Sequence, residues 1–434
     1  MTKLKPRIFK GARDFLPEQM MHRERIIETM KTIFRKYGFA PLETPAIEYL
    51  DVLSGKYGDE ADKLIYKLNY KTGTADEAAL HYDLTVPLSR VVAMQADLPL
   101  PFKRYQIQPV WRADRPQPHQ GRFREFYQCD CDVIGSNSPL IEAELIAITW
   151  EVLQTLGFKD FVVKINSRKI LNGITQYVGL PSSATIDICR SIDKLDKIAW
   201  KEVEQELLDN NYPSLTVAKL KALFYDSKVT LSQLKGVLSD IPEAIEGIAT
   251  LERIFEYLEI WGVSGENYTF DVTLARGLDY YTGAIFETKL PLHPHIGSLT
   301  GGGRYDTMIG MFTGKDLPAV GTTLGLDRIF TAMQQLDMLP SVSTHTKVLV
   351  ANFSDTTLVY NLKLVSMLRQ NNISAELYPE AAKLKKQFTY AEKKGIPYII
   401  IAGDEEVENG TCNLKNLTSG TQINLPLEEL VKKL

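Results

Sequence analysis

Hydrophobic positions along the chain predict an alternation of amphipathic helices and short strands. Apolar residues recur at spacings of three and four between residues 18 and 37, which is the period of a helix with one buried face. Pro17 before this stretch and Gly38 after it are typical start and stop signals. The next segment, residues 39–48, contains two prolines, so we expect an extended strand at a sheet edge or an interface.

A strand hairpin and further helices are predicted in the middle of the chain. Residues 102–107 and 125–134 have strand-like patterns and flank a polar loop, residues 115–121. Residues 139–156 predict another amphipathic helix. Between residues 185 and 260 the chain is rich in Lys, Glu and Leu without a strand pattern, so we expect a mostly helical insertion.

Strand and turn patterns return at Tyr268, continue through Glu287 and lead to a helix that begins near Gly325. The glycine-rich residues 300–306 lack the ending of a P-loop and the spacing of a dinucleotide fingerprint. We therefore interpret this segment as a tight turn that lets a sheet pack closely.

A separate pattern begins after a linker that contains Pro, Ser and Thr. Strand and helix alternate there, which predicts a small α/β domain. The expected fold class is α/β, with an antiparallel β-sheet flanked by helices in an α+β main domain, a helical insertion and the separate C-terminal domain. The predicted parts are a main domain in two pieces (1–184 and 261–336), the insertion (185–260), the linker (337–346) and the C-terminal domain (347–434).

Composition narrows the class of protein. The 434 residues carry a net charge of −4, so any contact with RNA must come from local basic patches rather than a global field. Four cysteines are too few for a disulfide scaffold, and Cys129 and Cys131 lack zinc-ligand spacing, so we predict two core residues and no metal site. With neither a secretory signal nor a run of about 20 apolar residues, we expect no membrane contact and a cytoplasmic protein.

The hairpin carries the first candidate site. Arg112 ends its first strand, and Arg124, Glu125 and Phe126 begin the second. Because side chains of one parity share a face of a sheet, an arginine that grips phosphate and an aromatic that stacks on a purine suit a nucleotide. A solvated strand face with charge pairs is the alternative.

The second strand of the hairpin continues with a polar face. Gln128, Asp130 and Asp132 fall at alternate positions of the strand. Unpaired polar groups in a dry core cost about 1–3 kcal/mol each, so this face is either wet or binds a ligand. Acceptors at one end and an arginine at the other suit a zwitterion with a polar side chain.

Three other segments carry candidate residues. Asp83 and Thr85 suit an ammonium group, although Asp-x-Thr also serves as a turn or helix cap. Residues 276–283 combine glycines with Tyr280 and Tyr281, which favours a ligand pocket over a turn with aromatic packing. Arg328 falls in the first turn of a helix, where a cation is unfavourable, so a bound anion, a pairing with the neighbouring aspartate or solvation must explain it.

Together these segments resemble the histidine–tRNA ligases, a family of class II aminoacyl-tRNA synthetases. The segment ending at Pro45 is similar to motif 1, which forms the dimer interface in the family. The hairpin is similar to motif 2, and residues 325–328 to motif 3. Residues 276–281 resemble the signature peculiar to the histidine enzymes, and residues 302–306 its companion. The C-terminal domain resembles the family's anticodon-binding domain, which makes the main domain the catalytic one.

The resemblance implies a histidine-binding set. In it, Asp83, Thr85 and Gln128 hold the α-amino group of the substrate. Asp132 and Tyr281 contact the imidazole, and Tyr280 lines the same pocket. The complete implied set is Asp83, Leu84, Thr85, Arg112, Gln128, Asp132, Arg276, Tyr280 and Tyr281.

The resemblance also implies how ATP is bound and used. Arg112 and Arg276 are the implied catalytic residues: Arg112 binds the α-phosphate, and Arg276 bridges it to the carboxylate of histidine. Phe126 stacks on adenine and Arg328 holds the ATP tail, while Asp114 and Arg122 match positions near ATP. Mg²⁺ accompanies ATP, and tRNA(His) and a second copy of the chain are the implied partners.

Three acids and one loop depart from the commonest bacterial pattern. Asp83, Asp132 and Asp327 stand where glutamate is frequent, which keeps the charge on a shorter side chain, and the content of the loop 115–121 is unusual. A non-catalytic paralogue that regulates ATP phosphoribosyltransferase is the nearest alternative, but such paralogues typically lack the anticodon-binding domain and the motif arginines. A ligase for another amino acid and a pure RNA-binding protein are further alternatives.

Overall fold

The computed structural model describes residues 4–54, 62–69, 77–95, 97–196, 198–226, 229–275, 280–341 and 343–434. Contacts between Cα atoms divide the chain into two compact units. The larger unit contains residues 25–338 together with the N-terminal residues up to 13, and the second contains residues 339–434 together with residues 14–24. None of the described helices is long and apolar enough to cross a membrane.

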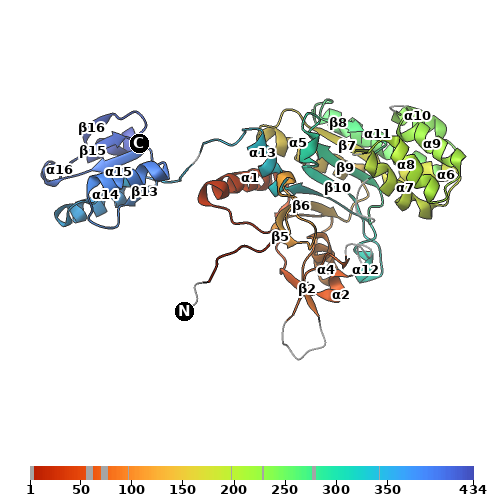
Figure 1. Ribbon diagram of the computed structural model, residues 1–434, viewed down its shortest axis with the longest axis horizontal. Coiled ribbons are helices and arrows are strands. Elements are labelled where there is room, and N and C mark those ends of the chain that lie inside the picture. Colours follow the sequence, from red (N-terminus) through yellow and green to blue (C-terminus); the bar gives the residue numbers. More distant parts are fainter. Residues whose placement is uncertain are drawn as a thin grey trace. The chain divides into compact units, whose positions relative to one another are not determined.

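An eight-stranded sheet forms the centre of the larger unit (Figure 1). The outer pairs, β1 with β5 and β7 with β8, are parallel, and all other neighbours are antiparallel. In spatial order the strands are β1 (Ala40–Pro41), β5 (Phe102–Trp111), β6 (Glu125–Ile134), β11 (Ala319–Gly325), β10 (Thr300–Arg304), β9 (Ala284–Lys289), β7 (Val162–Ser167) and β8 (Tyr268–Phe270).

Two of the predicted features contact β5, the second strand of this sheet. The amphipathic stretch is helix α1 (Pro17–Lys36), which buries Ile26, Met30 and Phe34. The proline-containing segment pairs as β1 with β5, so the prediction of an edge strand is correct. The predicted hairpin is β5–β6, with a first strand four residues longer than its sequence pattern indicated.

The glycine-rich segment differs from its prediction. Residues 300–304 form strand β10 inside the sheet, between β9 and β11, so the interpretation as a tight turn is wrong. A Cβ atom on Gly302 would lie 2.3 Å from the carbonyl oxygen of Gly321 on β11. The close packing that we expected therefore occurs across a strand pair rather than at a turn.

Helices cover the sheet and form the insertion. α4 (Thr85–Met94), α5 (Pro139–Thr155) and α13 (Leu326–Gln335) pack in the body of the unit. A small sheet of β2 (Ile47–Tyr49), β4 (Ala78–Leu80) and β3 (Lys67–Leu68) lies with the short α2 (Leu50–Leu53) and α12 (Gly310–Thr313). Between β7 and β8 the described residues form helices, seen at the right of Figure 1: α6 (Arg168–Tyr177), α7 (Thr185–Ile192), α8 (Trp200–Asp209), α9 (Ser214–Phe224), α10 (Leu231–Val237) and α11 (Pro242–Ile260).

The C-terminal unit has its own five-stranded sheet and its own hydrophobic core. The first three strands are parallel, and β15 and β16 add an antiparallel edge that the sequence patterns did not indicate. In spatial order the strands are β13 (Ala375–Leu377), β12 (Val348–Val350), β14 (Tyr398–Ile401), β15 (Thr411–Asn416) and β16 (Gln422–Pro426). The helices are α14 (Leu358–Gln370), α15 (Leu384–Lys394), α16 (Asp404–Asn409) and α17 (Leu427–Lys433).

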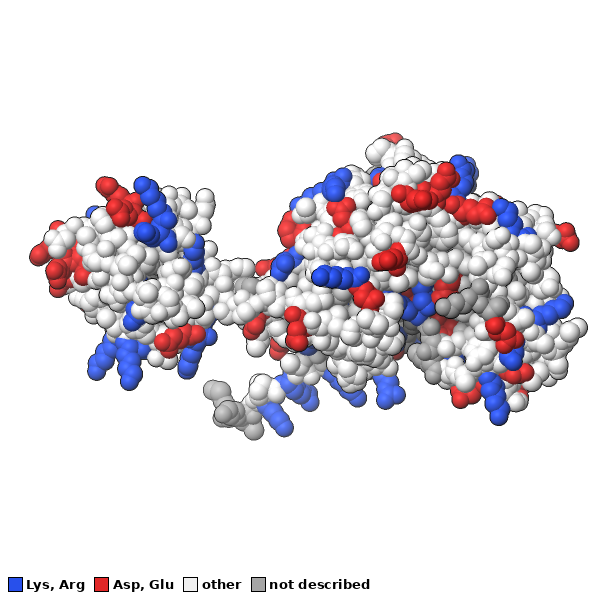
Figure 2. All heavy atoms as spheres, turned by 90° about the horizontal axis from the view of Figure 1, so that it is seen from above, with Lys and Arg blue, Asp and Glu red and all other residues white. Residues whose placement is uncertain are grey.

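Charges of both signs are interspersed over the face of the molecule that Figure 2 shows. This agrees with the small net charge of −4. An anionic ligand is therefore attracted by local groups of side chains, not by the charge of the whole protein.

Candidate functional site

A cleft of about 450 Å³ opens over the sheet of the larger unit. Its walls come from the β5–β6 hairpin, the segment before α4, strands β9 to β11 and the first turn of α13. The structure brings most of the predicted site residues together here: Asp83, Thr85, Arg112, Asp114, Arg122, Phe126, Gln128, Tyr280, Tyr281 and Arg328 line the cleft.

Arg112 directly follows β5 and is held by neutral partners. Its Nε donates to the carbonyl oxygen of Tyr82 at 3.1 Å, and its Nη2 donates to Oε1 of Gln128 at 3.0 Å. The guanidinium lies over the rings of Tyr82 and Phe126, at 4.3 and 5.1 Å from the ring centroids. Among the described residues no carboxylate forms an ion pair with Arg112, so its charge faces the cleft uncompensated and suits an anionic ligand.

Asp83 combines the two roles that its pattern suggested. Its Oδ1 accepts hydrogen bonds from the backbone N–H groups of Thr85 and Val86, at 3.1 and 3.2 Å, and so caps the start of α4. Its Oδ2 is buried and has no hydrogen-bond partner among the described residues. A buried carboxylate oxygen without a partner is costly, so this oxygen is suited to receive an ammonium group from a ligand.

Leu84 lies between these two residues but not in the wall of the cleft. Its side chain is fully buried in the core, and its carbonyl oxygen accepts a hydrogen bond from Arg104 at 3.3 Å. Leu84 is therefore the one member of this predicted segment that does not line the cleft.

The polar face of β6 is buried, and its side chains are paired within the protein. Gln128, Asp130 and Asp132 are all more than nine-tenths buried. They lie opposite Gln108, Gln106 and Arg104 on β5. Gln128 lines the cleft and donates to both carboxylate oxygens of Asp130, at 3.3 and 3.4 Å. The partners of these side chains come from β6 itself, from Arg104 on β5, from Thr323 on β11 and from Tyr305, so burial of this face does not by itself require a ligand.

Asp132 lies behind the cleft wall. Its Oδ1 accepts from the hydroxyl of Tyr305 at 2.5 Å, and its Oδ2 lies 2.9 Å from Nη2 of Arg104. Both partners were missed in the sequence, although Arg104, Gln106 and Gln108 alternate along the first strand and so indicated a polar face there. A Cβ atom on Gly321 would collide with Asp132, which explains a glycine at that position of β11.

Burial controls the protonation of this acidic pair. It raises the pKa of Asp130 to about 7, with Arg104 acting to lower the value and Asp132 to raise it. The pKa of Asp132 is also raised by burial, while Arg104 and the hydroxyl of Tyr305 oppose the shift. Because two carboxyl groups share one arginine, a proton on Asp130 is the arrangement that burial favours near neutral pH.

Tyr280 and Tyr281 form an aromatic wall at the same end of the cleft. Their ring centroids are 4.9 Å apart, and the ring of Tyr280 meets that of Tyr305 edge to face at 5.8 Å. The side chains of Tyr280 and Thr85 are hydrogen-bonded, and burial raises the pKa of both cleft tyrosines. Both phenols are therefore neutral hydrogen-bonding groups. The preceding residues 276–279, which include the predicted catalytic Arg276, lie outside the described residues.

Arg328 lines the cleft from α13. It lies in the first turn of α13, and its Nη1 donates to the carbonyl oxygen of Ser298 at 2.8 Å. The adjacent Asp327 points elsewhere: it contacts Arg13 at 2.5 Å and accepts from the backbone N–H of Tyr127 at 3.0 Å. The printed partner of Arg328 is therefore a backbone carbonyl, and the anionic ligand predicted from the sequence stays a prediction.

Asp114 and Arg122 pair with each other across the loop of the hairpin. Arg122 Nη2 lies 2.5 Å from Asp114 Oδ2, and both side chains are partly exposed. His81 is fully buried, and its two ring nitrogens lie 3.1 and 2.8 Å from the carbonyl oxygens of Pro45 and Pro109. Cys129 and Cys131 are buried free thiols, and no group of three metal-binding side chains occurs among the described residues.

The order of the sheet, the arginine that follows its first hairpin strand and the arginine that opens the last helix of the unit are those of a class II aminoacyl-tRNA synthetase. The chain belongs to the histidyl-tRNA synthetase family, because the model of that family matches residues 11–329. Residues 347–434 match the model of an anticodon-binding domain.

Relatives match the chain over nearly its full length. It is 44% identical to the histidine–tRNA ligase of Cytophaga hutchinsonii, with 99% of each chain covered. It is 45% identical to that of Gloeobacter violaceus, with 96% of each covered. Among solved structures, histidyl-tRNA synthetase from Nostoc has a TM-score of 0.88 at 31% identity, with 99% of each chain covered.

A structure described as an ATP phosphoribosyltransferase regulatory subunit/histidyl-tRNA synthetase, from Bacillus halodurans, is also similar. Its TM-score is 0.75 at 23% identity, with 92% of this chain and 99% of that chain covered. At this identity the likeness shows a shared fold and carries no argument for a regulatory role.

Proposed function

We propose that this chain ligates L-histidine to tRNA(His) through a histidyl-adenylate and consumes ATP. One observation carries the proposal beyond family membership: a single cleft joins the unpartnered Oδ2 of Asp83 to the uncompensated guanidinium of Arg112. These groups match the ammonium of an amino acid and the phosphate of a nucleotide, which must meet for the acid to be activated.

The histidine end of the cleft is assigned to the polar groups around Asp83. Asp83, Thr85 and Gln128 would hold the α-amino group, and Tyr281 would contact the imidazole beside Tyr280. The predicted contact of Asp132 with the imidazole stays part of the proposal. Its carboxylate already contacts Tyr305 and Arg104, so a bound imidazole would join an existing network. A site built to hydrogen-bond a polar side chain rejects analogues that lack it.

The ATP end is assigned to the hairpin and α13. Phe126 would stack on adenine, Arg328 would hold the phosphate tail, and Asp114 with Arg122 would lie beside the nucleotide. Arg112 would bind the α-phosphate between the two substrates. Arg276 enters from the sequence alone, as a second cation on the carboxylate and the α-phosphate.

Mg²⁺ is part of the same proposal. It is commonly bound by one or two carboxylates together with the phosphates of a substrate, which does not require a cage of protein ligands. Glu287 places a carboxylate in the cleft wall next to Ser298, so this residue fits such a role. The ion would neutralise charge on the phosphates of ATP.

The proposed chemistry requires orientation and charge neutralisation. A carboxylate oxygen of histidine attacks the α-phosphorus of ATP, a new P–O bond forms, and the bond to pyrophosphate breaks. The terminal hydroxyl of tRNA then attacks the activated carbonyl carbon and AMP leaves. Both partners of the first step are anionic, so arginines aimed at the developing charge supply the stabilisation, and no protein nucleophile is needed.

The partners of the ligase are proposed from surface features. Exposed lysines on and just before α15, at positions 383, 385, 386 and 393, offer local contacts to tRNA phosphates. A groove of about 640 Å³ beside β2 exposes Ile47, Tyr49 and Met94, which suits a second copy of the chain. The four free cysteines agree with the cytoplasmic location that we also propose.

Exchange of labelled pyrophosphate into ATP, measured with each amino acid in turn, tests the adenylation step. We expect exchange with histidine alone, followed by transfer of histidine to tRNA(His) when the tRNA is added. Absence of exchange with histidine would overturn the proposal, and exchange with another amino acid would overturn the assignment of Tyr281 and Asp132. Exchange without transfer would contradict the assignment of the C-terminal unit to tRNA binding.

A further inference from the structure

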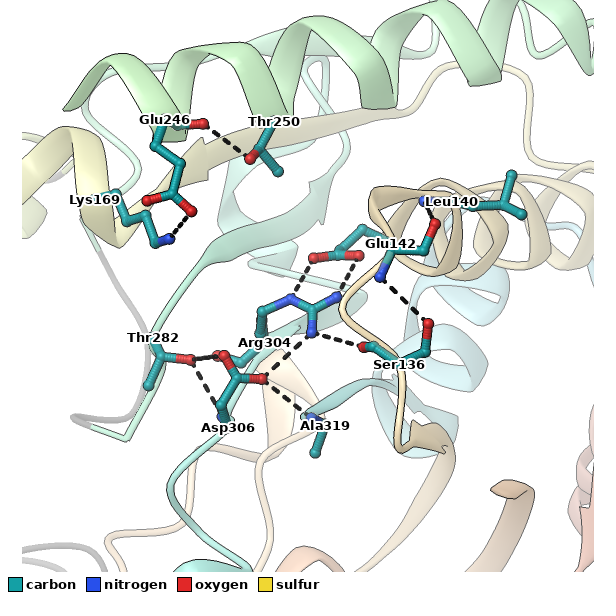
Figure 3. A network of polar contacts seen from close by, with 11 residues as sticks. Ser136, Leu140, Glu142, Lys169, Glu246, Thr250, Thr282, Arg304, Asp306 and Ala319 are labelled. Atoms are coloured by element: carbon teal, nitrogen blue, oxygen red, sulfur yellow. Dashed lines mark hydrogen bonds and ion pairs between the residues drawn. The ribbon is translucent and has the colours of Figure 1, made fainter. Parts of the chain in front are cut away.

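A buried ion-pair network lies next to the aromatic end of the cleft. Arg304, at the end of β10, donates from Nε and Nη2 to the two carboxylate oxygens of Glu142 on α5, at 2.7 and 2.8 Å (Figure 3). Its Nη1 donates to the carbonyl oxygen of Ser136 at 3.0 Å and to Oδ1 of Asp306 at 3.3 Å. All of the guanidinium nitrogens are used, and both charges of the bidentate pair are buried.

Asp306 connects this network to the segment that carries the cleft tyrosines. Its Oδ2 accepts from the hydroxyl of Thr282 at 3.0 Å, and its backbone N–H donates to the same hydroxyl oxygen at 3.1 Å (Figure 3). The backbone N–H of Thr282 donates to the carbonyl oxygen of Arg304 at 2.8 Å. Three hydrogen bonds therefore fix the residue that directly follows Tyr281.

The same strand end also shapes the space around the tyrosine rings. A Cβ atom on Gly303 would lie 2.9 Å from the ring of Tyr281, so only glycine leaves room for this ring. Tyr305 packs edge to face against Tyr280 and donates its hydroxyl proton to Asp132. Residues 303–306 thus contact each side chain that the proposed function assigns to the imidazole, although neither Arg304 nor Asp306 lines the cleft.

We propose that the Arg304–Glu142 pair, acting through Asp306 and Thr282, is a positioning device that sets where Tyr281 meets the substrate's side chain. The inference rests on the proposed function, because it assumes that histidine binds at the aromatic end of the cleft. The desolvated, bidentate pair has a fixed geometry. Because Thr282 is hydrogen-bonded to this network, the backbone position of the adjacent Tyr281 is fixed as well. The device acts on the amino acid and leaves ATP binding unchanged.

The Thr282 hydroxyl is the link that a substitution can remove without changing shape. Thr282→Val deletes the hydroxyl from a half-buried side chain, whereas Thr282→Ser keeps it. Thr250→Val is the matched control, because Thr250 on α11 is also half-buried and its hydroxyl donates to the carbonyl oxygen of Glu246 at 2.9 Å (Figure 3). Thr250 does not line the cleft.

Pyrophosphate exchange with the full chain, at varied histidine and at varied ATP, measures the effect. In Thr282→Val we expect the KM for histidine to rise about tenfold, which is the usual effect of losing one buried hydrogen bond. The KM for ATP and the melting temperature should stay near the wild-type values. Thr282→Ser and Thr250→Val should both keep the wild-type KM for histidine.

Two results would overturn the inference. One is an unchanged KM for histidine in folded Thr282→Val, and the other is a fall in kcat alone that accompanies a lower melting temperature. Should Thr282→Val not fold, Asp306→Asn provides the second test. An amide has a single acceptor oxygen, so it cannot accept from Thr282 on one side and from Arg304 and Ala319 on the other, as the carboxylate does. An unchanged KM there would equally overturn the device. Failure of the wild-type chain to exchange with histidine would instead overturn the proposed function itself.

Discussion

At the scale of single residues, Arg112 is the side chain whose chemistry is hardest to replace. Its planar guanidinium contacts Gln128 and the carbonyl oxygen of Tyr82 from different nitrogens, while its face covers two aromatic rings. A lysine carries the same charge on a single nitrogen and cannot make these contacts together. The surrounding residues therefore fix the position of the positive charge on Arg112, and a lysine would not place its charge at the same point.

Replacing Arg112 by lysine should therefore lower the rate of histidine-dependent pyrophosphate exchange by about 100-fold or more, the usual effect of losing one aligned transition-state contact. The matched control is Arg124→Lys. Arg124 lies on the same hairpin, donates to the carbonyl oxygens of Asp114 and Lys10, and does not line the cleft. Equal rates for the two variants would contradict the role given to Arg112.

The buried Asp130 predicts a dependence of stability on pH. Arg104 on β5, Thr323 on β11, Asp132 on its own strand and Asp83 before α4 act on its carboxyl group, and burial raises its pKa from 3.8 to about 7. A carboxyl with a higher pKa in the folded state binds its proton more tightly when folded. Its contribution to stability is therefore complete below about pH 4 and is lost as the pH rises through about 7.

Asp130→Asn should remove this part of the pH dependence, because asparagine is neutral at every pH. We expect its melting temperature to exceed that of the wild type most at pH 8 and least at pH 5, measured by scanning calorimetry across that range. Some slope should remain, since the pKa of Asp132 is raised as well. Parallel curves for the two proteins would show that Asp130 is ionised throughout.

Residue identity also decided how much of the site was predictable. Asp83, Arg112, Phe126 and Tyr281 were found because each combines a distinctive chemistry with a short local pattern, and the cleft brings them together. Arg104, Glu142 and Tyr305 were not found, because their partners lie on other elements and local spacing does not report such pairings. Asp132 matched its pattern but lies behind the wall, not in it.

At the scale of elements, side-chain periodicity determined which helices and strands could be predicted from the sequence. Helix α1 and the β5–β6 hairpin were correct because their apolar residues repeat at the periods of a helix and a strand. The sequence Thr-Gly-Gly-Gly-Arg has almost no side chains to alternate, so β10 was mistaken for a turn. The overall fold class, a sheet-based catalytic domain with a separate C-terminal α/β domain, was nevertheless confirmed.

The glycines of β10 provide a matched pair of substitutions. A Cβ atom on Gly302 would lie 2.3 Å from the carbonyl oxygen of Gly321, whereas the atom nearest to a Cβ on Gly301 is 3.9 Å away. Gly302→Ala should therefore lower the free energy of unfolding by about 1–3 kcal/mol, as overpacking does in other cores. Gly301→Ala should remain close to the wild type in the same urea titration. Equal free energies of unfolding for the two variants would contradict this prediction, because they would mean that β10 and β11 can move apart to accept the Cβ atom at no energetic cost.

At the scale of the whole molecule, the groove beside β2 predicts assembly. Ile47 and Tyr49 are more than half exposed on β2, and Met94 is 67% exposed at the end of α4. Apolar residues gathered around one groove are uncommon on the surface of a protein that stays monomeric.

Ile47→Lys should accordingly shift the mass measured by light scattering from about twice 49.0 kDa to about 49.0 kDa. Burying a lysine in an apolar contact leaves its charge without a partner, which weakens association. Leu292→Lys is the control, because Leu292 is 74% exposed and does not line the groove. A wild-type mass of one chain, or a dimer that survives Ile47→Lys, would contradict the proposed dimer surface.

The order of the central sheet also has a consequence for synthesis on the ribosome. Strand β6 supplies one wall of the cleft, and the neighbour that covers its free edge, β11, begins about 185 residues later in the chain. At about 5–20 residues per second, that edge waits roughly 10–40 seconds for its partner. The helices of the insertion are synthesised during this interval, so they can fold before β11 pairs with β6 and completes the cleft. Chaperones that shield strand edges therefore have a defined period in which to act on this chain.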